Sequence, residues 1–198
     1  MRASSFALAA VLGIAALTLG VSPTLAPRLG SEAEATTAVL MTLDEMVRVS
    51  EHVVVVEPVE RVSQWETVGN SERIVTYTRV VIESPVVGQA QGEVWVRTLG
   101  GTVGKIGQHV AGEAQFTLHQ KALVFLARPG EKFVVTGMAQ GHFPIDESDA
   151  ARTLKSSPDT GTLLRSKKST GPSAREELVG ETLARASQKI QAAKAAQK

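Results

Sequence analysis

The chain has 198 residues, of which 43% are hydrophobic, and its formal net charge is +1 at pH 7. This composition is typical of a globular protein with one packed domain and an appendage. The absence of cysteine excludes disulfides, thiolate metal sites, a cysteine nucleophile and a lipid-modified cysteine. The domain must therefore be stabilised by packing without covalent cross-links.

The N-terminus carries the pattern of an export signal. An apolar run over residues 6–21 follows Met1 and Arg2, and small residues precede Pro27. A run of this length, so close to the start, is typical of a secretory signal peptide rather than a membrane span. It predicts a signal peptide over residues 1–26 and an exported protein, periplasmic or extracellular. Because proline after Ala26 resists cleavage, the alternative is an uncleaved segment that tethers the domain to the membrane.

Charge is divided unevenly along the chain. Residues 27–150 hold ten Lys or Arg against sixteen Asp or Glu, whereas residues 151–198 hold ten against four. The basic tail either folds back on the acidic body, contacts an anionic partner such as a membrane surface, or is simply solvated. The acidic body argues against nucleic acid as a partner, because it would repel the phosphates.

The first elements are a linker and a short N-terminal helix. Residues 27–41 are rich in small and acidic residues and are expected to be a linker. Thr42 and Glu45 have the spacing of a capping box, which predicts a helix that starts at Thr42 and ends near Glu51. Leu43, Met46, Val47 and Ser50 would fall on one face of this helix.

The next ninety residues have the composition of strands. Residues 52–62 contain four consecutive valines, a density that favours a strand buried on both faces. Pro58 cannot donate to a strand ladder, so it predicts a bend or bulge. After turn residues near Gly69, residues 73–83 alternate in polarity and are expected to form a long hairpin with the first strand. Further strands are expected over residues 93–99, 122–127, 132–138 and 141–145, whereas residues 112–119 are of mixed character.

Five or six strands without alternating helices predict a mainly β fold. The expected architecture is a small antiparallel five- or six-stranded barrel, OB-like, over residues 42–150. Residues 151–173 are rich in Ser, Thr, Lys, Gly and Pro and are expected to be a flexible linker. Residues 174–198 are expected to form a C-terminal amphipathic helix with a thin, alanine-rich apolar stripe.

The reactive residue types form no recognisable constellation. The histidines are scattered without metal-ligand spacing, and no nucleophile-elbow pattern occurs, so the sequence predicts no catalytic residue, metal or cofactor. His109 and His119 flank one loop and could meet. Trp65, between Gln64 and Glu66, is the aromatic residue expected to be exposed. We therefore take Trp65, His109 and His119 as a candidate binding surface.

The strand segments resemble a group of exported bacterial domains and, more distantly, the OB-fold barrel of tissue inhibitors of metalloproteinases and netrin modules. The resemblance is carried by strand order and glycine placement: residues 53–59, 76–83, 92–96 and 122–126, with Gly100 and Gly101. It implies a fold, an exported location and protein binding. It does not extend to the mechanism of those inhibitors, which bind zinc through an N-terminal cysteine that this chain lacks.

These observations lead to two hypotheses of function. The first is an exported, non-enzymatic binding module for a protein or another cell-envelope component, with a basic C-terminal helix that contacts a second partner or a membrane surface. The alternative is an envelope hydrolase, or an accessory or inhibitor of one, with a site near the glycine-rich loop between Gly100 and Gly112.

Overall fold

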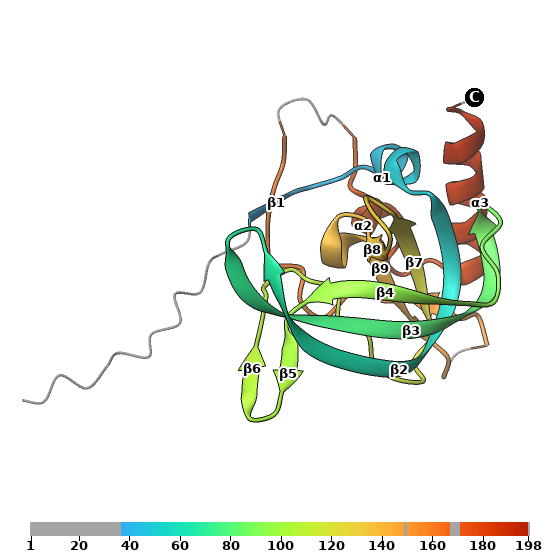
Figure 1. The fold of residues 1–198 in the computed structure, drawn as a ribbon. Coiled ribbons are helices and arrows are strands. Elements are labelled where there is room, and N and C mark those ends of the chain that lie inside the picture. The colour runs from blue at the N-terminus through green and yellow to red at the C-terminus, as the bar shows by residue number, and fades with distance from the viewer. Residues whose placement is uncertain (1–36, 149, 167–170, 198) are drawn as a thin grey trace, which may run out of the picture. The chain divides into compact units, whose positions relative to one another are not determined.

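The computed structural model describes residues 37–148, 150–166 and 171–197, and the fold of this part is mainly β (Figure 1). The predicted signal peptide and residues 27–36 of the predicted linker lie outside the described residues, whereas residues 37–39 of that linker form a strand. The strands are β1 (Thr37–Val39), β2 (His52–Val68), β3 (Ser71–Val87), β4 (Glu93–Leu99), β5 (Gly101–Val103), β6 (Ile106–Gln108), β7 (Ala122–Ala127), β8 (Phe133–Val135), β9 (His142–Asp146), β10 (Thr153–Leu154) and β11 (Thr162–Leu164). The helices are α1 (Leu43–Val49), α2 (Ala174–Leu178), α3 (Leu183–Ala195) and the 3-10 helix η1 (Met138–Gly141).

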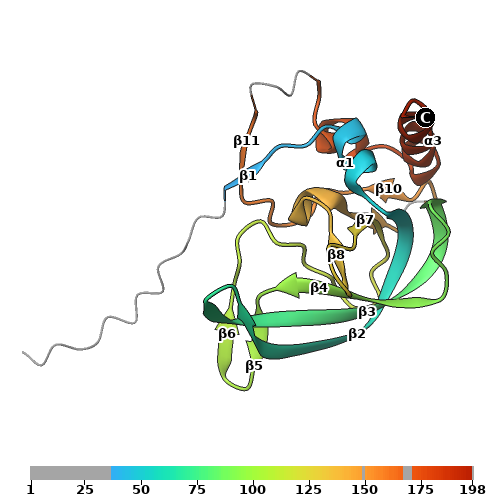
Figure 2. The ribbon, with the colours of Figure 1, turned by 45° about the horizontal axis from the view of Figure 1, so that its top comes forward.

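Seven strands form one sheet in the order β10-β9-β7-β2-β3-β4-β8, and an additional pairing between β7 and β8 closes β7, β2, β3, β4 and β8 into a ring (Figure 2). This sheet differs in two respects from the expected antiparallel sheet of five or six strands. It has seven strands, and β4 pairs with β8 in parallel. The reason is topological, because β8 pairs antiparallel with β7 while also lying beside β4. The segment over residues 112–119, expected to be of mixed character, contributes no strand.

Strand β2 is buried on both faces along its valine run, as predicted. Val53 and Val55 belong to one core cluster, together with Phe125 and Phe143. Val54 and Val56 belong to a second cluster. Because successive side chains of a strand point to opposite faces, the four valines place β2 between the two core clusters, with two valines packed in each.

The hairpin and the bend also match the sequence. β2 pairs with β3 along nearly its whole length, from Val53 with Val87 to Val68 with Ser71. The register shifts between Pro58 and Glu60, where proline cannot donate a ladder hydrogen bond. Bulges of this kind increase the local twist, which helps a two-stranded ribbon to curl toward ring closure.

The N-terminal helix α1 starts with the predicted capping box. The Thr42 hydroxyl accepts from the Glu45 amide at 3.3 Å, and the Glu45 carboxylate accepts from the Thr42 amide at 2.9 Å. Both orphan amides of the first turn are thereby satisfied. The predicted apolar face of Leu43, Met46 and Val47 is buried in the first core cluster.

The C-terminal region differs from the expected single helix on a flexible linker. Two helices, α2 and α3, replace it, and each starts at its own N-cap, Ser173 and Thr182. The break has a local cause, because Gly180 adopts a left-handed φ of 86°. The expected linker supplies β10, which pairs with β9, and β11, which pairs with β1.

The apolar stripe of α3 is covered by the rest of the chain. Ala186, Ile190 and Ala193 are buried in the first core cluster with Val53 and Leu123. Arg152, on the segment leading to these helices, forms an ion pair with Glu83 of β3 at 2.9 Å. The tail therefore folds back on the body through both apolar and charged contacts. None of the helices in the described ranges is long and apolar enough to cross a bilayer.

The burial of α3 leads to a first prediction. Ile190→Ala should lower the free energy of unfolding by about 2–5 kcal/mol, because it leaves a cavity in the first core cluster. Gln188→Ala, an exposed position on the same helix, should change it by less than about 0.5 kcal/mol. Urea denaturation followed by circular dichroism measures both. Equal effects of the two substitutions would contradict the docking of α3.

Candidate ligand-binding cavity

A cavity of about 670 Å³ opens on the inner face of the distal half of the β2–β3 hairpin, beside β4 and the β5–β6 hairpin. We call it the Glu113 cavity. Its volume is in the range of small-molecule sites, but its wall is unusually polar. The cavity is lined by the polar side chains of Arg61, Ser63, Thr76, Thr78, Thr98 and Glu113. Gly101, Gln108, His109, Gln115, Phe116 and Thr117 also line it.

The polar wall arises from a change of side-chain type along β3. Val80 of β3 packs inside the ring in the second core cluster. Two and four residues earlier, on the same face, Thr78 and Thr76 replace valine. Their cross-strand neighbours are Arg61 and Ser63. The inner face of the hairpin is therefore apolar near the core and hydroxyl-rich toward its tip.

Glycine at position 101 allows β5 to lie directly against these hydroxyls. A Cβ atom there would be 2.1 Å from Thr76 Oγ1 and 2.6 Å from Ser63 Oγ. The backbone also has a φ of 131°, which side-chain-bearing residues rarely adopt. Glycine in this loop thus allows the backbone of β5 to pack against the side chains of Thr76 and Ser63. The loop also contains the β5–β6 hairpin.

Glu113 is the buried acid of the cavity. Its neighbours Ala114 and Phe116 pack in the second core cluster and anchor the segment in the ring. The Glu113 side chain is 8% exposed, and its two carboxylate oxygens accept from the amides of Leu99 at 3.2 Å and Ala114 at 3.0 Å. Burial raises the pKa of this carboxyl, and the two amide hydrogen bonds and the charge of Arg97 oppose the rise.

The hydroxyl groups of the wall form a directed chain. Thr76 Oγ1 donates its proton to the Gly100 carbonyl at 2.6 Å, and it lies 2.8 Å from Ser63 Oγ. Thr98 Oγ1 donates to the Thr76 carbonyl at 3.4 Å. In contrast, the buried Thr78 Oγ1 has no hydrogen-bond partner among the described residues. An unpaired buried hydroxyl destabilises the fold, so a contribution to stability does not explain why threonine occupies position 78.

The structure separates the three residues of the predicted binding surface. His109 lines the Glu113 cavity and pairs with Asp159, with 2.9 Å between Nε2 and Oδ2. His119 lines a different, smaller cavity with Asp146 and Lys155. Trp65 is 43% exposed, as expected, and its backbone pairs with Ile74 of β3. Of the three, His109 alone borders the Glu113 cavity.

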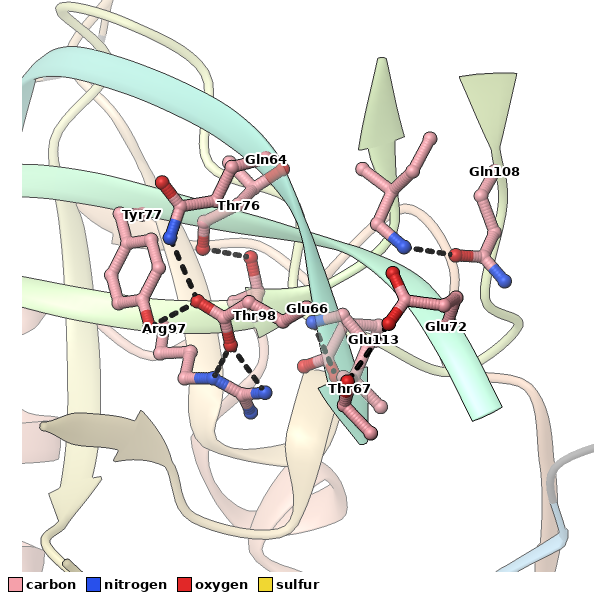
Figure 3. A network of polar contacts seen from close by, with 12 residues as sticks. Gln64, Glu66, Thr67, Glu72, Thr76, Tyr77, Arg97, Thr98, Gln108 and Glu113 are labelled. Atoms are coloured by element: carbon pink, nitrogen blue, oxygen red, sulfur yellow. Dashed lines mark hydrogen bonds and ion pairs between the residues drawn. The ribbon is translucent and has the colours of Figure 1, made fainter. Parts of the chain in front are cut away.

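The opposite face of the hairpin carries a second polar network. Figure 3 shows Tyr77, Gln64 and Arg97 directed toward the carboxylate of Glu66. The hydrogen bond from the Tyr77 hydroxyl, 2.7 Å long, is the largest cause of the lowered pKa of Glu66. Because Arg97 is held by Glu66 at 3.1 Å, its charge acts on Glu113 only from the other side of the sheet.

A buried histidine supports the inner wall. His142 is 3% exposed, its ring packs edge-on against Phe116 with centroids 4.9 Å apart, and its Nδ1 lies 3.2 Å from Ser157 Oγ. Burial lowers the pKa of His142 to about 4, because the charged imidazolium loses its hydration. His142 is therefore a neutral packing residue at physiological pH.

The described side chains offer no metal centre. Within residues 37–148, 150–166 and 171–197, no group of three or more His, Asp or Glu side chains is arranged to hold a metal ion. The Glu113 cavity itself contains one carboxyl group. Its chemistry is thus that of hydrogen bonding and a single buried charge.

Sequence reasoning missed the two most informative residues of the cavity. Neither Glu113 nor Thr78 belongs to a recognisable motif. A signal was present for Thr78, since alternating threonines interrupt the apolar face of residues 73–83 before Val80. For Glu113 the signal was its place between glycine and alanine, with Phe116 three residues later.

The unpaired hydroxyl gives a second prediction. Thr78→Val should raise the free energy of unfolding by about 1 kcal/mol, because it removes a buried polar group without a partner. Thr76→Val, on the same strand face, should lower it by about 1–2 kcal/mol, since the Gly100 carbonyl and Ser63 lose their partner. Thermal and urea denaturation measure the difference. A destabilised Thr78→Val variant would show that this hydroxyl is satisfied.

His142 gives a third prediction. Its folded-state pKa is depressed from 6.5 to about 4, so the unfolded chain takes up a proton at higher pH than the folded chain. The stability from neutral His142 is therefore complete above pH 6.5 and is lost as the pH falls toward 4, in total about 3 kcal/mol. Denaturation across this window should show the loss in the wild type and in His119→Gln, and a much weaker slope in His142→Gln.

Comparisons with known proteins leave the cavity to be interpreted from its own chemistry. No protein-family model, curated protein or solved structure matches the chain. The features that any function must account for are the buried Glu113 carboxyl, the hydroxyl-lined wall and the His109–Asp159 pair beside them.

Proposed function

We propose that the chain is an exported, non-enzymatic binding module that holds a polar ligand, belonging to a protein or another cell-envelope component, in the Glu113 cavity. The observation that carries this proposal is a buried carboxyl in a cavity whose polar wall lowers the stability of the fold. Glu113 is desolvated, and Thr78 is buried without a partner. Departures of this kind from favourable packing concentrate at binding sites.

The proposed scaffold is a small OB-like barrel. This is supported by the ring of β7, β2, β3, β4 and β8, in which one parallel pair, β4 with β8, closes four antiparallel pairs. A five-stranded, partly open Greek-key barrel has this number of strands. The distant likeness to tissue inhibitors of metalloproteinases and netrin modules stays a proposal about the fold and carries no residue of their mechanism.

Export and the partner class rest on the sequence. The apolar run over residues 6–21 supports secretion to the periplasm or the outside of the cell, with membrane tethering if the segment is not removed. Contact of α3 with a membrane surface would have to be electrostatic, because Ala186, Ile190 and Ala193 are already buried. Among its basic side chains, Arg185 is exposed and Lys194 is half-buried.

A second candidate is an envelope hydrolase, or an accessory or inhibitor of one. The His109–Asp159 pair favours it, because a carboxylate that orients a histidine is a common general-base arrangement. Binding remains the better supported function. The cavity holds a single carboxyl, and the described residues include no group of three side chains arranged to hold a metal ion. Release of a chemically altered ligand would favour the hydrolase.

Site-specific photo-cross-linking tests the proposed function. A photoreactive residue at exposed Gln115, which lines the cavity, should form an adduct with an envelope component in cells that produce the protein. The same residue at exposed Gln188 on α3 is the matched control and should form none. The Gln115 adduct should fall at least fivefold when Ser63→Trp fills the cavity, with folding verified by circular dichroism. No adduct at Gln115, or equal adducts at both positions, would contradict the proposal.

A further inference from the structure

The hydroxyl chain of the Glu113 cavity leaves a wall of hydrogen-bond acceptors. Thr76 Oγ1 donates its single proton to the Gly100 carbonyl. Ser63 Oγ must therefore be the donor in the 2.8 Å hydrogen bond between the two hydroxyls. Thr98 Oγ1 likewise donates its proton to the Thr76 carbonyl. The hydroxyl oxygens of Ser63 and Thr98 therefore present lone pairs, and no proton, to the cavity. A ligand that complements this wall brings donors.

Glu113 extends the acceptor surface and adds charge. Each carboxylate oxygen accepts one backbone amide, which leaves a further lone pair on each. The carboxyl is 8% exposed, so water screens it poorly, and a cation beside it gains more than it would at an exposed acid.

The charged groups around Glu113 do not neutralise it directly. Arg61 lines the cavity but is exposed, and its Nη1 donates to the Phe116 carbonyl at 3.3 Å. Arg97 is paired with Glu66 on the other face of the sheet. His109, also in the lining, is held by Asp159. None of these three groups forms an ion pair with Glu113, so a cationic group of a ligand could be its ion-pair partner.

On this basis, and resting on the proposed binding function, we propose that the ligand of the Glu113 cavity is a polyhydroxylated primary amine, an amino sugar, whose ammonium group binds Glu113. An ammonium brings three donors and a positive charge, which match an acceptor-rich wall with one buried carboxylate. The sugar hydroxyls can donate to Ser63 and Thr98 and accept from the amide nitrogens of Gln108 and Gln115. A cavity of about 670 Å³ has room for such a ligand.

The test compares two probes that differ in one group. Glucosamine and glucose are titrated at neutral pH into the full chain by calorimetry, and backbone amides are followed by NMR. We expect glucosamine to bind at least tenfold more tightly than glucose. Its addition should shift the Leu99 and Ala114 amide signals, because both groups donate to the Glu113 carboxylate.

Three variants separate the roles of charge and wall. Glu113→Gln should abolish the preference for glucosamine, whereas Glu131→Gln, at an exposed loop position, should leave it unchanged. Ser63→Ala should weaken both probes several-fold and preserve the preference. Amide spectra of each variant verify folding, and if Glu113→Gln does not fold, the Leu99 and Ala114 shifts in the wild type decide.

The inference and the proposed function can fail separately. Equal binding of glucosamine and glucose, or shifts that spare Leu99 and Ala114, would overturn the amino-sugar proposal while the Gln115 adduct still supports a binding cavity. Absence of that adduct together with absence of sugar binding would overturn both. A glucosamine preference that persists in folded Glu113→Gln would also overturn the inference, because the ammonium would then bind elsewhere.

Discussion

The fold depends on the two-sided burial of β2. Its four valines enter two core clusters, and the strand pairs with β3 on one side and β7 on the other. The two cores lie on opposite sides of this strand: α1 and α3 cover the first cluster, and the ring encloses the second. Burying β-branched side chains on both faces gives the chain a rigid centre without cross-links.

The same strand explains why the cavity lies where it does. Beyond the bulge at Pro58, β2 continues past the reach of both cores, and β3 accompanies it to the turn. Hydroxyl groups of Ser63, Thr76 and Thr78 line the inner face there, and the β5–β6 hairpin covers part of it. A polar site next to a rigid core is well suited to recognition, because the packing of the neighbouring apolar core holds its walls in place.

Local patterns were readable from the sequence, and long-range closure was not. The capping box at Thr42, the bulge at Pro58 and the valine run involve residues close in sequence, and each was predicted correctly. The parallel pairing of β4 with β8 and the docking of Ile190 depend on which distant surfaces meet. Glu113 escaped prediction for the same reason, since its burial is created by strands that lie far from it in the chain.

The placement of α3 has a consequence for how the protein folds. Val53, near the start of the described chain, and Ile190, near its end, belong to one cluster. That core stays incomplete during synthesis until α3 has emerged, and its closure requires contacts of very large sequence separation. Such topologies fold slowly and expose apolar surface on the way. The nascent chain therefore exposes this apolar surface to factors that bind unfolded polypeptides until α3 has been synthesised.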